Sequence, residues 1–315
     1  MVVMRQRTIA KVALAAVALL ALVRSGSGQS QSSVPSALAA SSSVGASPLV
    51  SAEQAGTAVA GGGLIMGSTK RRILHFTFDD GPDPDPQLTP RLLDALDRVH
   101  AKATFFFSTS RFASKEKRNA QAAEMAREVA RRGHQVGSHG FEHQRMSRLK
   151  PAQLATQMAA SEQAFEQVFG RRTFLFRPPF GSRNATLDAM LSQSRYATVI
   201  WNIGMADWVE RPPEAIALTF WRVLARNETR DGDRGGVVLL HDTHAWSVSA
   251  FELIAAELGR RNCELLGKGE ELFDVVDSLE PWVTPLSDAA YAQRQAARVA
   301  EAKARCSAPG SPQAR

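Results

Sequence analysis

Cysteine is scarce in this chain of 315 residues, which contains only Cys263 and Cys306. Two cysteines can form a single disulfide bond, which export from the cell would permit but not require. Cys263 falls in a short apolar run that we expect to be a strand, and Cys306 falls in a polar C-terminal segment. The sequence therefore favours two free thiols.

The N-terminal apolar run is also too short to cross a membrane comfortably as a helix. The apolar run Val12–Val23 has twelve residues, whereas a transmembrane helix needs about 20. Basic residues precede this run, and the small residues Ser25–Gly28 follow it, which is the pattern of a cleaved secretory signal. We expect residues 1–28 to be a signal peptide and no stable span to remain after cleavage. The mature protein is then exported, to the periplasm, the cell envelope or the extracellular space.

Net charge is absent from the central part of the chain. The formal charge is +7, but residues 1–30 contribute +4 and residues 286–315 contribute +3, so the remainder is electroneutral. A nucleic-acid-binding domain normally carries a basic patch on one face. The sequence therefore argues against a nucleic acid as partner.

Charged residues are nearly missing from residues 29–69, where Glu53 is the only one. A segment of Ser, Ala, Gly and Pro cannot bury enough apolar surface to order itself, so we expect a disordered spacer. Residues 286–315 read as a polar, alanine-rich, helix-like tail. A hydrophobic content of 44% supports a substantial core in between, and we expect one domain over residues 70–285.

Between these boundaries, short apolar runs alternate with longer amphipathic segments. Strands are expected at Ile73–Phe78, Ala103–Phe107, Gln135–Ser138, Thr173–Phe176, Ala197–Trp201, Val237–His241 and Cys263–Leu266. Helices are expected near 87–99, 119–132, 151–169, 185–194, 213–228, 248–260 and 270–279. Parallel strands need crossovers of about a dozen residues, so this alternation predicts an α/β fold with a parallel sheet. Periodicity alone does not decide between a barrel and an open sheet.

Two adjacent carboxylates, Asp79 and Asp80, end the first expected strand, where Gly81-Pro82 breaks the backbone. Enzymes with parallel sheets place their chemistry at the carboxyl ends of the strands. Neighbouring residues on a strand point to opposite sides. One carboxylate can therefore bind a cation while the other handles protons.

His139 and His143 follow the third expected strand. Their spacing of four presents both imidazoles to one side of a turn or helix. With a carboxylate from another strand, two such histidines make a metal site of three protein ligands with open positions.

Three further groups follow later strands. In the run Arg177 to Gly181, the arginine can form a bidentate ion pair with a carboxylate. The residues after the two prolines can direct their N–H groups at a ligand.

Asp207-Trp208 follows the fifth strand. His241-Asp242 ends the sixth, and a histidine there with an acid in reach meets the requirement for a general acid. The other four histidines are expected to be structural, with His244 placed to line the cleft.

These motifs resemble, in order and rough spacing, those of the polysaccharide deacetylases, the NodB-like family also called carbohydrate esterase family 4. The five motifs are Thr77-Phe78-Asp79-Asp80-Gly81, His139-x-x-x-His143, Arg177-Pro178-Pro179-Phe180, Asp207-Trp208 and Leu239-Leu240-His241-Asp242. The resemblance spans about residues 70–280. It implies a distorted (β/α) barrel of seven or eight strands with the site at the strand carboxyl ends.

The resemblance also implies a metal site and a base. Asp80, His139 and His143 are then ligands of a divalent metal, most often zinc, with Co²⁺ or Ni²⁺ as alternatives. Asp79 is the base for a metal-activated water, and Arg177 holds Asp79 in place.

It further implies how the substrate is held and cleaved. His241, oriented by Asp207, protonates the departing sugar nitrogen, and Phe180 offers its backbone N–H to the oxyanion. Pro179 is implied to contact substrate, while Trp208 and Leu239 enclose the acetyl methyl group. The reaction releases acetate by hydrolysing a non-peptide amide bond of an acetylated polysaccharide, and we expect a monomer.

The chain departs from the usual family pattern at three positions. Gly140 replaces a Ser or Thr after the first metal-binding histidine, so a loop-steadying hydrogen bond is expected to be lost. Gly204 stands where many members carry Asp, and Phe180 where Tyr is common. None of these changes removes a predicted ligand or proton-transfer group.

Other functions remain open at this stage. The same site would suit an O-acetyl esterase acting on xylan-type polymers, and the same fold would suit a non-catalytic carbohydrate-binding relic. Two histidines and one carboxylate also occur in non-haem iron(II) oxygenases, but the alternation of strands and helices argues against that class. The polymer itself, whether peptidoglycan, chitin oligomers, exopolysaccharide or xylan, depends on loop shape and stays open.

Overall fold

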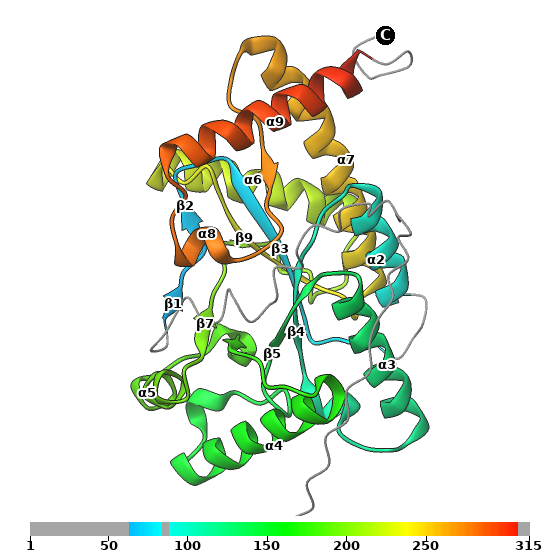
Figure 1. Cartoon of the computed structure of the whole chain (residues 1–315), viewed down its shortest axis with the longest axis vertical. Helices are drawn as coiled ribbons and strands as arrows, with labels where there is room; N and C mark the ends of the chain where they lie inside the picture. The colour runs from blue at the N-terminus through cyan, green and yellow to red at the C-terminus, as the bar shows by residue number, and fades with distance from the viewer. Residues whose placement is uncertain (1–62, 84–87, 308–315) are drawn as a thin grey trace, which may run out of the picture. The chain divides into compact units, whose positions relative to one another are not determined.

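The computed structural model describes residues 63–83 and 88–307. The expected signal peptide and most of the expected spacer lie outside the described residues. Within them, helices cover a curled sheet of mostly parallel strands (Figure 1). None of the described helices is both long and apolar enough to cross a bilayer.

The sheet runs in the order β1-β7-β6-β5-β4-β3-β9-β2, with β10 added beside β3 and β8 beside β9. All of these pairings are parallel except that of β2 with β9. The strands are β1 (Leu64–Ile65), β2 (Ser68–Thr69), β3 (Ile73–Asp79), β4 (Thr104–Phe107), β5 (Gln135–Ser138), β6 (Leu175–Phe176), β7 (Ala197–Val199), β8 (Ile203–Gly204), β9 (Gly235–His241) and β10 (Asp274–Val275). In the described part of the chain no ladder joins β7 to β8, so the sheet curls as a barrel does without closing there.

Eight α-helices are described, and six of them follow the expected alternation. They are α2 (Leu88–Arg98), α3 (Lys117–Arg131), α4 (Pro151–Phe169), α5 (Ala185–Gln193), α6 (Pro213–Asp231), α7 (Ala245–Lys268), α8 (Glu280–Val283) and α9 (Asp288–Cys306). Short 3-10 turns lie at η1 (Thr109–Phe112), η2 (Met146–Arg148) and η3 (Pro179–Gly181). The predicted α/β fold with a barrel-like parallel sheet is confirmed.

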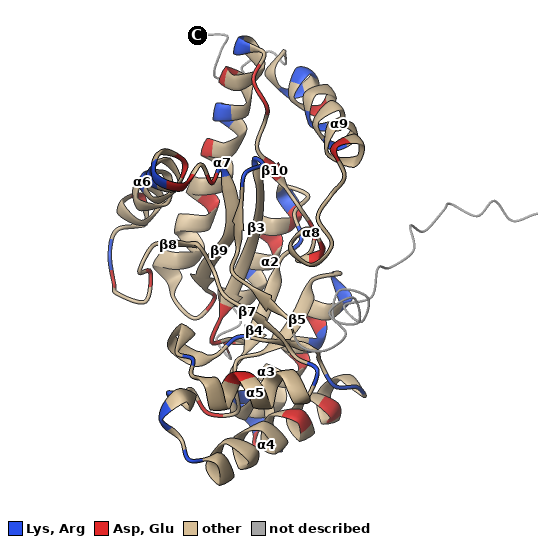
Figure 2. Ribbon diagram, turned by 90° about the vertical axis from the view of Figure 1, so that its left-hand side faces the viewer, with Lys and Arg blue, Asp and Glu red and all other residues tan. Residues whose placement is uncertain are grey.

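The central strand β3 shows how the sequence builds both the core and the site. Its even-numbered residues Leu74, Phe76 and Phe78 lie in the main hydrophobic core, under the helices. Its odd-numbered residues His75, Thr77 and Asp79 point to the other face, because side chains alternate along a strand. Figure 2 shows that Lys, Arg, Asp and Glu lie chiefly on the helices and loops. Asp79, at the carboxyl end of this face, lies among the site residues, whereas His75, near the start of the strand, hydrogen-bonds to Val276 and Thr104.

Two expected elements near the C-terminus were wrong. The run Cys263–Leu266 is not a strand but part of the 24-residue helix α7. The helix expected near 248–260 continues through this run to Lys268. The segment 270–279, expected to be a helix, contains strand β10, which pairs with the start of β3. Pairing with a long-range partner decided the structure there, and local periodicity does not report such a partner.

The expectation of two free thiols was also wrong. Cys263 on α7 and Cys306 on α9 form a disulfide bond, with their Cα atoms 5.8 Å apart. The two cysteines meet because α9 docks beside α7 and β10. Arg294 of α9 supports this docking, since its Nε lies 2.6 Å from the buried Oδ2 of Asp274.

The described chain extends the sheet beyond the expected start of the domain. Residues 64–69 fall within the expected spacer, but they form β1 and β2, which pair with β7 and β9 respectively. Trp282 Nε1 donates to the carbonyl oxygen of Gly67 over 2.8 Å, which ties this segment to α8.

Candidate active site

The predicted site residues gather at the carboxyl ends of the strands. Asp79 ends β3, and Asp80 follows it; His139 and His143 follow β5; Arg177, Pro179 and Phe180 follow β6; Asp207 and Trp208 follow β8; Leu239 and His241 lie in the last half of β9. In the ladder between β3 and β9, Asp79 lies opposite His241. This register brings the first and the fifth motif together, although they are 162 positions apart in the sequence.

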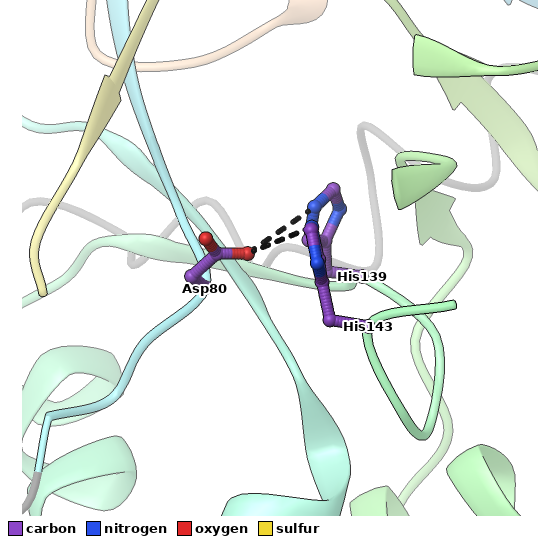
Figure 3. A group of neighbouring side chains, drawn as sticks. All are labelled: Asp80, His139 and His143. Carbon is purple, nitrogen blue, oxygen red and sulfur yellow. Dashed lines mark ion pairs between the residues drawn. The ribbon is translucent and has the colours of Figure 1, made fainter. Parts of the chain in front are cut away.

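Asp80, His139 and His143 converge on one point (Figure 3). Oδ1 of Asp80 lies 3.5 Å from Nε2 of His139 and 3.3 Å from Nε2 of His143. Ligand atoms from all three side chains lie within 4.8 Å of one another. Asp80 has φ of 75°, a left-handed conformation that is uncommon for residues other than glycine. This conformation interrupts the strand alternation, so both Asp79 and Asp80 lie near the histidines.

The donor set fits a divalent cation. Oδ1 of Asp80 is buried and has no hydrogen-bond partner, which is costly for a carboxylate unless a cation binds it. Nδ1 of His139 donates to the carbonyl oxygen of Arg177 over 2.7 Å, so its Nε2 lone pair faces Asp80 and His143. Burial lowers the pKa of His139 to about 3, which keeps the imidazole neutral. A neutral histidine held by such an outer hydrogen bond is the usual form of a metal ligand.

Asp79 is held apart from this cluster by Arg177. The guanidinium NH1 of Arg177 lies 2.7 Å from Oδ1 of Asp79 and 2.7 Å from Oγ1 of Thr77. The other oxygen, Oδ2, lies 3.7 Å from Nε2 of His139. Burial raises the pKa of Asp79 above that of an ordinary aspartate, against the lowering effect of the Arg177 charge. Asp79 is thus a buried carboxylate of raised proton affinity at the edge of the cation cluster.

His241 forms a second acid–base pair with Asp207. Nδ1 of His241 lies 3.1 Å from both carboxylate oxygens of Asp207, and its backbone N–H donates to Oδ2 over 2.8 Å. Burial alone would lower the pKa of His241, but the Asp207 carboxylate outweighs it and raises the pKa to about 9. Nε2 of His241 faces the cluster, 3.9 Å from Oδ2 of Asp80. The imidazole can therefore hold a proton at neutral pH and present it beside the cation cluster.

Sequence reasoning missed the groups that fix Asp207. Ser247 Oγ donates to Oδ2 of Asp207 over 2.6 Å, and Trp246 Nε1 donates to its backbone oxygen over 2.7 Å. Both residues lie in the first turn of α7. Their only sequence signal was their position shortly after His241, which does not reveal that the turn folds back onto the end of β8.

Two aromatic rings border the site. The Phe180 ring is 51% exposed and lies 4.4 Å from the His143 ring, and the Arg145 guanidinium lies 4.5 Å from its centroid. Trp208 is 53% exposed, with its ring 6.0 Å from that of His241. The remaining predicted contact residues, Pro179 and Leu239, are buried. The exposed rings provide flat apolar surface on two sides of the polar cluster.

The structure explains two of the departures from the family pattern. Gly140 has φ of 82°, a conformation that favours glycine. Its N–H donates to Ser138 Oγ over 3.1 Å and its carbonyl oxygen accepts from Thr109 N–H over 3.0 Å, so the loop remains held by hydrogen bonds. At Gly204, a Cβ would lie only 2.7 Å from Nε1 of Trp201. The indole ring occupies the space that a side chain at position 204 would need.

Of Asp207 and Asp242, it is Asp207 that contacts the ring of His241, and this is the partner that the family resemblance implies. Asp242 is fully buried and accepts a hydrogen bond from the Thr89 hydroxyl over 3.0 Å. Burial raises the pKa of Asp242 to about 7.

Of the other histidines, His75 and His134 are buried and hydrogen-bonded, as expected for structural residues. The ring of His244 lies 6.0 Å from that of His241, at the edge of the site.

The fold and the site together place a cation cluster and two acid–base pairs at the strand carboxyl ends, where α/β enzymes place their chemistry. Residues 66–199 match the family described as polysaccharide deacetylase. The chain is similar to this family, also called carbohydrate esterase family 4, over these residues. The predicted resemblance to this family and the predicted fold class are thereby confirmed, and the deacetylases among the relatives support the predicted enzyme class, hydrolases of amide bonds in acetylated polysaccharides.

Three relatives show what the chain is similar to. It is 28% identical over 196 residues to the peptidoglycan-N-acetylmuramic acid deacetylase PdaC of Bacillus subtilis, covering 62% of this chain and 38% of that protein. It is 29% identical over 206 residues to a peptidoglycan-N-acetylglucosamine deacetylase of Bacillus cereus, covering 64% of this chain and 88% of that protein. It is 32% identical over 187 residues to a chitin deacetylase of Pestalotiopsis, covering 59% of each.

A solved structure of PdaC from Bacillus subtilis has the same fold. Its TM-score is 0.51 at 25% identity, and the match covers 73% of this chain and 96% of that one. Among the curated relatives, the chain spans well under half of PdaC, somewhat more than half of the Pestalotiopsis protein and most of the Bacillus cereus protein.

Proposed function

We propose that this protein removes acetyl groups from N-acetylated sugars of a cell-wall polysaccharide and releases acetate. The observation that carries the proposal is the meeting of three groups in one site. These are the Asp80–His139–His143 cluster, the Asp79–Arg177 pair and the His241–Asp207 pair. A carbohydrate-binding relic would have no use for two separate proton-handling pairs beside a cation cluster.

Asp80, His139 and His143 would hold the divalent metal, for which zinc is our choice and Co²⁺ or Ni²⁺ are alternatives. When bound there, the metal would polarise the acetyl carbonyl and acidify a water molecule. Asp79 would accept the proton of the attacking water through Oδ2, the oxygen not engaged by Arg177. Its raised pKa makes it a stronger base than a solvent-exposed aspartate. Arg177 keeps this carboxylate aimed at the reacting atoms.

His241 would donate a proton to the sugar nitrogen as the C–N bond breaks. An amine leaves poorly unless it is protonated, so a group that still carries its proton at neutral pH is required. Because the pKa of His241 is about 9, the imidazole carries that proton at neutral pH. Asp207 fixes which ring nitrogen of His241 donates it. Nδ1 faces Asp207, so Nε2 is the donating atom.

Trp208, Leu239, Pro179 and Phe180 would surround the acetyl group and the sugar. Trp208 lies beside the proposed acid, and Leu239 lies on the same face of β9 as His241. The backbone N–H of Phe180 would stabilise the oxyanion, and losing one such donor typically costs about 3 kcal/mol. The exposed Phe180 ring offers a stacking surface for a sugar.

The disulfide between Cys263 and Cys306 supports export of the protein. Disulfide bonds persist in oxidising compartments and are rare in the cytosol. With the basic start and the apolar run Val12–Val23, this supports a proposed site of action in the periplasm, the cell envelope or outside the cell. Cleavage near Gly28, the boundaries of the domain over residues 70–285 and a monomeric state belong to the same proposal.

Acetate release from defined polymers tests this function. Peptidoglycan, chitin oligosaccharides, an acetylated exopolysaccharide and acetylated xylan are each incubated with the enzyme after chelation, and then after adding back Zn²⁺, Co²⁺ or Ni²⁺. We expect release from an N-acetylated polymer that chelation abolishes and a divalent metal restores. Release from acetylated xylan alone would instead identify an O-acetyl esterase. Binding without release from any polymer, with metal present, would contradict the enzyme proposal.

A further inference from the structure

Asp242 is the one acidic residue of the fifth motif that the proposed chemistry leaves unused. It is fully buried, and its Oδ1 has no hydrogen-bond partner. Asp79 and His241 lie opposite each other in the ladder of β3 and β9, so the next residues along each strand, Asp80 and Asp242, leave the sheet side by side. A buried carboxylate in this position needs an explanation, because burying such a group without full hydrogen bonding is unfavourable.

The Asp242 carboxylate lies against the backbone immediately after Asp80. A Cβ built on Gly81 would be 2.3 Å from both Oδ1 and Oδ2 of Asp242. Real side-chain contacts are not that short, so the carboxylate occupies the place where a side chain at position 81 would be. Its contact is therefore with the peptide units that set the direction of the Asp80 side chain.

Thr89 extends this contact to the other side of the turn. Its hydroxyl donates to Oδ2 of Asp242 over 3.0 Å and accepts from the N–H of Asp83 over 3.3 Å. Thr89 is fully buried in the first turn of α2. Asp242 and Thr89 together thus connect β9 and α2 to the segment that runs from Asp80 to Asp83.

The turn needs such support because Asp80 is in a left-handed conformation, with φ of 75°. Backbone hydrogen bonds hold the turn from the β4 side, where Asp80 N–H donates to Phe106 and Ser108 N–H donates to Gly81. Asp242 and Thr89 hold it from the opposite side. Residues in this region of φ persist where their surroundings fix them, and such residues cluster at functional sites.

We infer that Asp242, supported by Thr89, is a positioning residue that aims the Asp80 carboxylate at His139 and His143 and so sets the cation affinity of the site. This inference rests on the proposed function, because it presupposes a cation at that cluster. Asp242 acts through the backbone of Gly81 and does not itself bind the cation. Groups that orient metal ligands in this way typically change metal affinity by about 10-fold to 100-fold when they are removed.

The test measures Zn²⁺ affinity of the purified full chain by competition with a chromophoric chelator, together with the unfolding temperature of the metal-free protein. We expect D242A to weaken Zn²⁺ binding by at least about tenfold. T89V should weaken it in the same direction, since it leaves the carboxylate without its anchor. D242N should stay within about threefold of the wild type, because the amide fills the same space and its oxygen still accepts from Thr89.

D274A is the matched control. Asp274 is also fully buried, but it lies in β10, beside the start of β3, and pairs with Arg294. We expect D274A to lower the unfolding temperature while Zn²⁺ affinity stays unchanged, which separates a loss of stability from a loss of positioning.

Three results would overturn the inference: wild-type affinity in D242A, wild-type affinity in T89V, or equal losses in D242N and D242A, which would show that charge and not position matters. If D242A does not fold, T89V and D242N still decide the question. A wild-type protein that takes up no Zn²⁺, Co²⁺ or Ni²⁺ would instead contradict the proposed cation site itself.

Discussion

At the scale of single residues, the two neighbouring aspartates have different surroundings. Asp79 is ion-paired with Arg177 and only 2% exposed, whereas Asp80 is partly exposed and has an unpartnered oxygen that faces two histidines. Burial raises the pKa of Asp79 despite the Arg177 charge, so this carboxylate is suited to accepting a proton. A carboxylate that lacks a partner is suited to binding a cation.

These surroundings predict opposite kinetic behaviour for the two aspartates. Asp80→Ala should lower metal content, and excess Zn²⁺ should restore part of the activity. Asp79→Asn should keep wild-type metal content while turnover falls by about 10²-fold to 10⁴-fold, as is typical when a general base is lost. Measuring bound zinc and acetate release on the same preparations of each variant checks both predictions. Full activity of a zinc-loaded Asp79→Asn enzyme would remove the central step of the mechanism.

The pair formed by His241 and Asp207 predicts a shift in the pH profile. In the wild type the imidazole stays protonated up to its pKa of about 9, so activity should fall as the pH rises through about 9. Asp207→Asn removes the charge that raises this pKa and leaves burial, which lowers it. The alkaline limb of kcat/KM against pH should then move downward by more than about one pH unit.

Asp188→Asn is the control for this experiment. Asp188 lies on α5 and is a carboxylate that forms an ion pair with Arg183. The alkaline limb of kcat/KM against pH in the Asp188→Asn variant should remain that of the wild type. An unmoved limb in Asp207→Asn would exclude His241 as the titrating acid.

At the scale of elements, His134 joins two neighbouring strands at the end away from the site. It precedes β5, and its Nδ1 accepts from the N–H of Ala103, just before β4, over 3.1 Å. Nδ1 must be unprotonated to accept this bond. Burial lowers the pKa of His134 to about 4, which agrees with that requirement.

This histidine should make the protein less stable in acid. The unfolded-state pKa of histidine is about 6.5, so between pH 6.5 and about 4 the unfolded state binds a proton that the folded state does not. Stability from this group is complete above pH 6.5, and up to about 3 kcal/mol is lost as the pH falls toward 4. His134→Asn, whose side-chain oxygen can accept the same bond without titrating, should flatten the dependence of unfolding free energy on pH.

Chemical denaturation at several pH values between 4 and 7 measures this effect. His100→Asn is the control, because His100 is exposed at the end of the helix before β4 and should leave the pH dependence unchanged. Equal pH dependence in the wild type and His134→Asn would show that His134 is not responsible.

At the scale of the whole described unit, the disulfide attaches the C-terminal helix to the domain. It closes a segment with a sequence separation of 43 residues, for which chain entropy gives about 4 kcal/mol of stabilisation at 25 °C. Cys263 lies 16 residues beyond Ser247 along α7, or about 24 Å at 1.5 Å per residue. The bond is thus distant from the end of α7 that supports Asp207.

Cys306→Ser should therefore separate stability from activity. We expect unfolding free energy to fall by up to about 4 kcal/mol, while kcat/KM at 25 °C changes by less than about twofold. Guanidinium unfolding and acetate release measure the two quantities, and the wild type treated with a reductant should behave like the variant. A large loss of activity in a folded Cys306→Ser protein would show that α9 contributes to the site.

The sequence by itself predicted the candidate site residues of this protein and the order of most of its elements. Alternating apolar and amphipathic runs predicted six strands and six helices of the sheet domain, because burial on both faces of a parallel sheet leaves a local pattern. The motif residues at the strand ends were predicted for a related reason. Parallel strands that follow one another place their carboxyl ends at one edge, whatever the details of packing.

Only the tertiary structure decided which of these residues act as partners. It placed Ser247 and Trp246 around Asp207, bonded Asp242 to Thr89, and paired Cys263 with Cys306. Each of these contacts joins segments that are far apart in sequence or meet through a folded-back helix. Local pattern carries no information about such docking, because it depends on the shapes of both surfaces once they are packed together.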